Sequence, residues 1–200
     1  MEEALQKLRR DPILAAIIEQ VGPFAITYRP PQFESLVRSI ASQQISSKVA
    51  RVFLERLLAR MPDGRITPEA ILRMRPSTFR KLGFSAAKTE YIRDLARKTA
   101  SGELSFEQFP SMSDDDIIEH LTSVKGIGVW TAHMFLIFAL RRPDILPVGD
   151  LGIRAAIRKA YGLPALPAPV EMHAIAENWR PWCSVACWYL WRSLDGAAQV

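Results

Sequence analysis

The chain has 200 residues, of which 48% are hydrophobic, and its 26 Lys and Arg against 21 Asp and Glu give a net charge of +5. This length can bury one sizeable core or two lobes, and the basic balance favours an anionic partner. No signal-peptide pattern opens the sequence, and its longest apolar stretch, about 129–140, is shorter than the roughly 20 residues of a membrane helix. We therefore expect a soluble, intracellular, cytoplasmic protein with no membrane segment.

Apolar residues at helical spacing dominate the first half of the chain. Asp11 and Pro12 begin a segment with one apolar face, and Gly22 ends it. Further helices are expected at 33–40, from a Ser46 cap to about 58, from Thr67-Pro68 to about 75, from Ser85 to Gly102, and from Ser113 into a glycine pair at 126–128. No segment shows the sustained alternation of a strand.

The second half of the chain continues the helical pattern. The segment VWTAHMFLIFAL after Gly128 is apolar nearly all round, which indicates a helix packed inside the protein. The linker DILPVGD leads to an amphipathic helix that ends at Gly162, and two last helices are expected around 171–179 and 182–194. We count about ten helices and predict the all-α class.

Cysteine and histidine usage argues against the common metal centres. Only Cys183 and Cys187 are present, too few for a disulfide framework or a four-cysteine iron–sulfur cluster. The three histidines are scattered without a pair at helical spacing, which argues against a catalytic zinc site. We expect both cysteines to be small core residues, and we expect no required cofactor.

A glycine pair interrupts the helices within LTSVKGIGVWTA, residues 121–132. A helix, a G-x-G turn and an immediately following helix leave backbone N–H groups at a helix N-terminus, where a phosphate binds readily. Gly126 and Gly128 present no side chain to a sugar–phosphate strand, and Lys125 adds a positive charge. A tight turn whose glycines only adopt positive φ fits the same residues, and both interpretations stay open on this stretch alone.

The order of several segments resembles a known family. LTSVKGIGVWTA followed by PVGDLGIR resembles the helix-hairpin-helix superfamily of base excision DNA glycosylases. DPILAAIIEQVGP, FESLVRSIASQQISSKVA, KLGFSAAKTEYIRDLA and ENWRPWCSVACWYLWR are similar to segments of its 3-methyladenine DNA glycosylase II family, so the resemblance spans residues 11 to about 193. It implies a single compact all-α domain of two helical lobes with a cleft between them, one lobe about 32–143 and the other 1–31 plus 144–200.

The resemblance also implies an activity. Members of this family flip alkylated purines, such as 3-methyladenine and 7-methylguanine, out of double-stranded DNA and hydrolyse the N-glycosidic bond, leaving an abasic site. Trp130 stands where bifunctional relatives place the lysine that forms a Schiff base, which favours a monofunctional enzyme. We expect a monomer whose partner is duplex DNA containing alkylated bases.

Asp150 is the catalytic aspartate by this resemblance. Breaking an N-glycosidic bond develops positive charge on the sugar, and a fixed carboxylate stabilises that charge. From the sequence alone, Asp150 would be interpreted as the cap of the helix that begins at Leu151. The two roles are compatible.

The remaining site residues are likewise carried over from the family. The implied base pocket contains Trp130, Trp191, Met134 and Leu151. The implied DNA contacts are Lys125, Gly126, Ile127 and Gly128 in the hairpin, with Gln44 and its neighbour Gln43 as the wedge that fills the gap left by the flipped base. A structural monovalent cation, found in some members, would be held by the backbone carbonyls of Thr122, Val124 and Ile127.

Some positions depart from the family pattern, and alternatives remain. Met134 replaces a tyrosine of some relatives, Leu151 stands where an aromatic residue can occur, and Cys183 replaces a common arginine, which leaves base selectivity open. Core packing explains Trp179, Trp182 and Trp188 better than a pocket role does. The rival functions are a bifunctional glycosylase/lyase for oxidised bases that uses Lys125, and a non-catalytic helical DNA-binding module.

Overall fold

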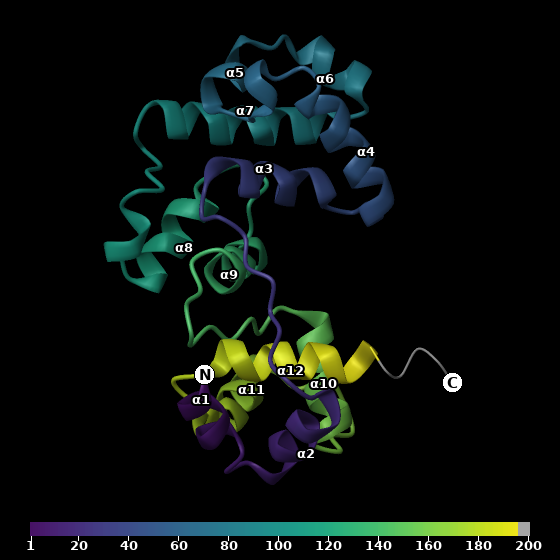
Figure 1. Ribbon diagram of the computed structural model, residues 1–200, viewed down its shortest axis with the longest axis vertical. Helices are drawn as coiled ribbons and strands as arrows, with labels where there is room; N and C mark the ends of the chain where they lie inside the picture. The colour runs from purple at the N-terminus through teal and green to yellow at the C-terminus, as the bar shows by residue number, and fades with distance from the viewer. Residues whose placement is uncertain (196–200) are drawn as a thin grey trace. The chain divides into compact units, whose positions relative to one another are not determined.

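The computed structural model describes residues 1–195, and within this range it contains twelve α-helices, three short 3-10 helices and no strand (Figure 1). The all-α prediction is therefore confirmed. By its internal contacts the chain divides into two compact units, Arg29–Phe135 and Met1–Tyr28 together with the chain from Leu136 on. The second junction lies inside α9 (Val129–Phe138), earlier than the boundary near 143 that we expected, and Phe138 at the end of this helix stacks on Trp191 of the C-terminal segment.

The unit 29–135 is built around one long helix, α7 (Ala86–Ala100), which packs against α3, α5 and α6 (Figure 1). Its other elements are α3 (Phe33–Ser42), α4 (Ser47–Leu58), α5 (Pro68–Arg73), α6 (Pro76–Leu82), α8 (Asp114–Thr122), the first turns of α9, and the 3-10 turns η1 (Pro62–Gly64) and η2 (Phe109–Ser111). The expected caps are present at four of these helices, where a side-chain oxygen accepts a backbone N–H of the first turn: Ser46, Thr67, Ser85 and Ser113. Because these caps are local, the helix starts could be predicted from the sequence.

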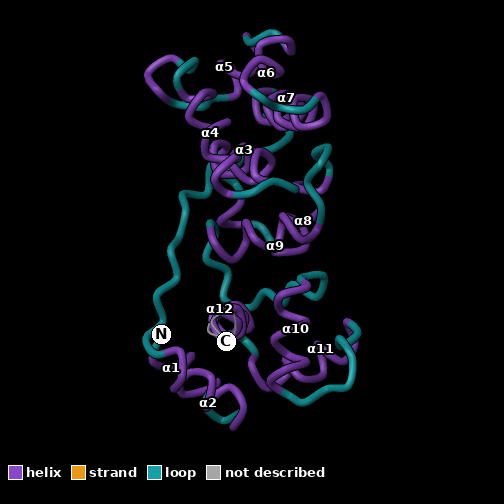
Figure 2. The backbone as a smooth tube through the Cα atoms, turned by 90° about the vertical axis from the view of Figure 1, so that its right-hand side faces the viewer, coloured by secondary structure: helices purple, strands orange, loops and turns teal. Residues whose placement is uncertain are grey.

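The other unit is assembled on α12 (Cys183–Asp195), which packs against both α2 and α10 and is viewed end-on in Figure 2. Its helices are α1 (Glu2–Leu8), α2 (Pro12–Val21), α10 (Leu151–Ala160), α11 (Pro169–Ala176) and the 3-10 turn η3 (Glu177–Trp179). No helix in the described range, residues 1–195, is long and apolar enough to cross a membrane.

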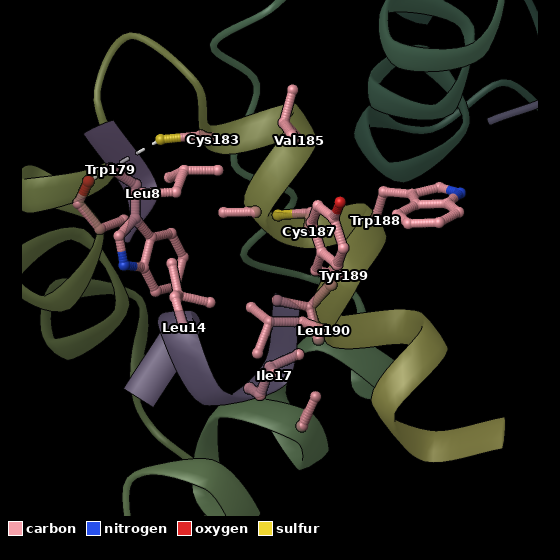
Figure 3. Packing of buried hydrophobic residues seen from close by; sticks show 14 of the residues in the cluster. Leu8, Leu14, Ile17, Trp179, Cys183, Val185, Cys187, Trp188, Tyr189 and Leu190 are labelled. Carbon is pink, nitrogen blue, oxygen red and sulfur yellow. Dashed lines mark hydrogen bonds between the residues drawn. The ribbon is translucent and has the colours of Figure 1, made fainter. Parts of the chain in front are cut away.

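The core of this second unit contains both cysteines and two of the tryptophans, as expected (Figure 3). Cys183, Cys187 and Trp179 are fully buried, Trp188 is nearly so, and the partly buried Trp182 packs against the same cluster. Burial raises the pKa of the Cys187 thiol well above its usual range. The thiol therefore stays protonated and serves as a small apolar group.

Asp11 links three elements of the same unit. Its Oδ1 accepts the amides of Ile13 and Leu14 at 2.9 and 3.2 Å and so caps α2, while its Oδ2 accepts the hydroxyl of Tyr161 and the Nε1–H of Trp179, the latter at 3.2 Å. Burial and the Asp11 carboxylate raise the pKa of Tyr161, which keeps the phenol a donor.

Replacing Asp11 should therefore destabilise the protein more than the loss of a single helix cap would. Asp11→Ala removes the cap and leaves the buried Trp179 indole and the partly buried Tyr161 hydroxyl without their acceptor, for an expected loss of about 2–4 kcal/mol in the free energy of unfolding. Urea unfolding measures this loss. Glu19→Ala, on the exposed face of the same helix, is the control and should change stability by no more than about 0.5 kcal/mol; equal effects of the two variants would contradict the role of Asp11.

Candidate functional site

Asp150 lies buried at the N-terminus of α10, with 8% of its surface exposed. Its Oδ1 accepts two hydrogen bonds, from the backbone N–H of Ile153 at 2.7 Å and from Nε1–H of Trp191 at 3.1 Å. The expected cap is confirmed, and the second donor was not foreseen. Two donors from different helices fix the orientation of this carboxylate, which is what electrostatic stabilisation of a developing cation requires.

Gly152 makes this arrangement possible. A Cβ at Gly152 would lie 3.0 Å from Asp150 Oδ1 and 3.3 Å from Trp191 Cδ1, closer than side chains normally approach. The indole of Trp191 also stacks on Phe138, with ring centroids 5.7 Å apart and planes 29° apart. Trp191 therefore acts on Asp150 through its N–H edge, in addition to any contact with a base, and the neighbouring Leu151 is 67% exposed.

The loop before Asp150 is held by the N-terminus of α12. The amide of Cys183 donates to Asp144 Oδ1 at 3.3 Å, and that of Ser184 donates to the carbonyl of Pro143 at 2.9 Å. Arg180 completes the arrangement with a 2.7 Å bond to Asp144 Oδ2. Asp144 thus caps a helix far along the chain, so one helix fixes the start of this loop and, through Trp191, the aspartate at its end.

At the place of the predicted helix-hairpin-helix, a short turn joins α8 to the first turns of α9, which belong to the unit 29–135. The carbonyl of Gly128 accepts the amide of Ala132 at 3.0 Å, so Gly128 is the N-cap of α9. Val129 and Trp130 in the first turn are 53% and 49% exposed, whereas Ala132 and Phe135 are buried. The expectation that α9 is buried all round was therefore wrong for its first turn. An exposed helix N-terminus of this kind attracts phosphate.

Glycine is needed at the two hairpin positions for different physical reasons. Gly126 has a φ of 78°, and a Cβ there would lie 2.1 Å from the ring of Tyr91, so this glycine serves the turn and its packing. Gly128 has nothing within 4 Å of the position a Cβ would take. Of these two glycines, only Gly128 therefore fits the interpretation that the protein backbone is left without a side chain so that a sugar–phosphate strand can approach it. Tyr91, on α7, was not among the site residues predicted from the sequence.

Lys125 is more firmly engaged than we expected. Its backbone N–H donates to the buried Asp94 at 3.0 Å, and its ammonium lies 3.2 Å from Glu90 Oε1. Hydrogen bonds from Lys125 and Arg97 lower the pKa of Glu90. The amide is thus used inside the protein, but the ammonium belongs to an exposed ion pair worth at most about 1 kcal/mol, which a phosphate can replace.

The loop after α3 joins the hairpin. Gln43 donates from Nε2 to the carbonyl of Gly126 at 2.8 Å, and Gln44, with a φ of 56°, is exposed beside it. Both line an open depression of about 540 Å³ together with Tyr91 and Trp130. The structure therefore brings the implied wedge, the hairpin and one implied pocket residue together; Met134, one helical turn after Trp130, is half-buried.

The carbonyls implied for a cation lie in the same turn. The Val124 carbonyl accepts the amide of Ile127 at 3.1 Å, which leaves one oxygen lone pair for another partner, and Thr122 is the last residue of α8. Residues 1–195 contain no cluster of three His, Cys, Asp or Glu that could hold a metal ion. A site in this turn would therefore use neutral oxygen donors, which suit hard cations.

The sequence from residue 37 to residue 181 matches the family described as HhH-GPD superfamily base excision DNA repair protein. The chain belongs to this family. A DNA-3-methyladenine glycosylase 1 from Schizosaccharomyces pombe is 38% identical over 182 residues, 90% of this chain and 80% of that protein. A putative DNA-3-methyladenine glycosylase from Bacillus subtilis is 34% identical over 188 residues, 91% of this chain and 66% of that protein.

Solved structures of HhH-GPD type agree with this assignment. The S. pombe 3-methyladenine DNA glycosylase in complex with abasic DNA matches 96% of this chain and 97% of its own with a TM-score of 0.84 at 34% identity. A DNA-3-methyladenine glycosidase from Bacillus halodurans matches with a TM-score of 0.87 at 34% identity, covering 96% of this chain and 89% of its own.

The different roles of the two glycines in this HhH-GPD hairpin can be tested by stability. Gly126→Ala should lower the free energy of unfolding by at least about 2 kcal/mol, because the new methyl group meets Tyr91 and the φ angle is positive. Gly128→Ala only weakens an N-cap and should cost less than about 1 kcal/mol. Thermal unfolding of both variants decides the matter; the reverse order of stability would contradict the assignment.

Proposed function

We propose that the protein is a monofunctional DNA glycosylase that removes alkylated purines, of the 3-methyladenine and 7-methylguanine type, from duplex DNA by hydrolysis of the N-glycosidic bond. The observation that carries the proposal is the buried Asp150 carboxylate, oriented by Ile153 and Trp191. The curated relatives named 3-methyladenine glycosylases support the substrate class. The abasic product would pass to base excision repair, on DNA in the cytoplasm.

Hydrolysis of the N-glycosidic bond of an alkylated purine requires one fixed anion and little acid catalysis. Alkylation gives the purine a positive charge and weakens its bond to the sugar, so the base leaves without a strong proton donor. The sugar then carries the positive charge, and a carboxylate already oriented by two N–H donors stabilises it without reorganising. Asp150 can also orient the attacking water. An exposed indole such as Trp130 attracts the cationic base by stacking.

Two features support hydrolysis without strand cleavage. Trp130, at the helix start, has no amine that could form a Schiff base with the sugar. Lys125, the rival candidate, is tied by its amide to Asp94 and by its ammonium to Glu90. An amine engaged in an ion pair with a carboxylate is less available as a nucleophile.

The hairpin would hold the DNA backbone. The N-terminus of α9 and the Lys125 ammonium present positive charge beside Gly128, where the backbone is bare. The carbonyls of Thr122, Val124 and Ile127 would hold a monovalent cation, whose charge would add to the attraction for a phosphate. Gln44 would enter the duplex where the base has left.

Asp150→Asn is the direct test. Asparagine keeps an oxygen acceptor for Ile153 and Trp191 but removes the negative charge, so release of 3-methyladenine and 7-methylguanine from methylated duplex should fall at least about 100-fold. Binding to a duplex with a stable abasic analogue should stay nearly unchanged. Asp115→Asn, exposed in the first turn of α8, is the control and should retain full activity.

Three outcomes would overturn the proposed reaction. Full activity of Asp150→Asn would remove the carboxylate from the chemistry. Borohydride trapping of a covalent complex between the wild-type protein and DNA would indicate a glycosylase/lyase instead. Salt-dependent binding without release of any base would favour the DNA-binding module.

Gly128→Leu tests the phosphate clamp. A bulky side chain at the bare N-cap should weaken binding of all duplexes by a similar factor, because phosphate contacts carry no base sequence information. Fluorescence anisotropy with several unrelated duplexes measures this, and Gly128→Ala is the smaller control. A loss confined to particular lesions or sequences would show that residue 128 faces bases rather than phosphates.

A further inference from the structure

Lys88 connects α7 to the loop between α3 and α4. It lies in the first turn of α7, and its ammonium donates to the carbonyls of Ala41 at 2.7 Å and of Gln43 at 2.6 Å. These carbonyls stand at the C-terminal end of α3, where the last carbonyls have no partner within the helix. A cation is favourable there because it faces the negative end of the helix dipole.

This contact is specific to the conformation of the loop. Burial lowers the pKa of the Lys88 ammonium, so the group has given up part of its hydration. The two carbonyl oxygens replace that hydration only while the loop keeps its shape. The ammonium therefore favours this loop conformation over others.

The same loop is held on its other side by Gln43. Its side-chain amide donates to the Gly126 carbonyl, 83 residues further along the chain, at 2.8 Å. Gln44 follows with a φ of 56°, a left-handed conformation that costs a non-glycine residue energy and persists where surrounding contacts impose it. The contacts on both sides of Gln44 supply that constraint.

We propose that Lys88 and Gln43 are positioning residues that hold Gln44 beside the hairpin as the single inserting side chain. This inference rests on the proposed function. It separates two glutamines that the family resemblance treated together, because Gln43 is occupied by the hairpin whereas Gln44 is exposed. The hairpin and the wedge thereby form one rigid element. When the hairpin at Gly126–Gly128 binds the DNA backbone, Gln44 is therefore placed against the duplex as well.

A positioned wedge matters only for duplex DNA. In a duplex the flipped base leaves a gap in the stack that must be filled, whereas a single strand has no opposing stack to hold open. Loss of Lys88 should therefore impair excision from duplex DNA and spare excision from the same oligonucleotide as a single strand. A general structural role would impair both.

The first experiment compares Lys88→Met, which keeps the apolar stem but removes the charge, with Lys81→Met, an exposed lysine of the same unit. Single-turnover excision of an alkylated base is measured on duplex and on single strand. For Lys88→Met the duplex rate should fall at least about tenfold, as expected for a lost charge-assisted hydrogen bond, with the single-strand rate unchanged. Lys88→Arg should restore part of the duplex rate, and Lys81→Met should behave as wild type.

A double-mutant cycle asks whether Lys88 acts through Gln44. If it does, Lys88→Met should cost little once Gln44→Ala is present, because the wedge is already gone. Gln43→Glu, which replaces the donating amide by an acceptor of the same shape, should repeat the duplex-specific loss, with Gln108→Glu at an exposed site as its control. Additive effects of Lys88→Met and Gln44→Ala, or equal losses on both substrates, would overturn the proposal.

Insertion can also be measured without catalysis. A 2-aminopurine beside a stable abasic analogue changes its fluorescence when a side chain enters the stack, and this change should be reduced in Lys88→Met and Gln43→Glu but not in Lys81→Met. If the wild-type protein releases no base, the proposed function fails while this assay still tests the positioning. An unreduced signal in Lys88→Met would overturn the inference even in an active enzyme.

Discussion

The unpaired backbone groups at helix ends are the constraint on which this structure depends. Every helix leaves amides at its start and carbonyls at its end that must find partners, and an all-helical chain has many such ends close together. Here distant residues satisfy several of them: Asp144 caps α12, and Lys88 caps α3 from the C-terminal side. The resulting bonds tie loops to helices far along the chain, which fixes loops that would otherwise be mobile.

The candidate site uses helix ends in two opposite ways. At α10 the end is closed, because Asp150 accepts the Ile153 amide and is thereby held in one orientation. At α9 the N-cap is a glycine and the first turn is exposed, so the end presents positive charge outward. A helix start that is closed by a carboxylate holds that anion in one orientation, whereas a helix start that is left exposed attracts an anion from outside the protein. The sequence distinguishes the two by an aspartate in one place and a glycine in the other.

This difference also explains what could be predicted from the sequence. The caps at Ser46, Ser85 and Asp150 are local, since each residue bonds to an amide three positions later, and their patterns predicted the helix starts. The seven-residue helices α1 and α6 were missed because they are too short to show periodicity and, unlike the six-residue α5, have no side-chain cap that marks their start. The contacts of Lys88 with Ala41 and of Gly126 with Tyr91 were missed for another reason: they join segments dozens of residues apart, and no local spacing encodes them.

Two departures from the family pattern, Cys183 and Leu151, have unequal consequences for the site. Cys183 lies in the core of its unit, and Arg180 three residues earlier bonds Asp144, so the missing arginine at 183 leaves the loop before Asp150 still anchored. Leu151 is largely exposed, and an aliphatic side chain there cannot attract a cationic purine as an aromatic ring would. Under the proposed function, discrimination would then depend more on the weakened glycosidic bond of the alkylated base, because a carboxylate fixed in advance would stabilise the sugar cation equally for any purine that can leave.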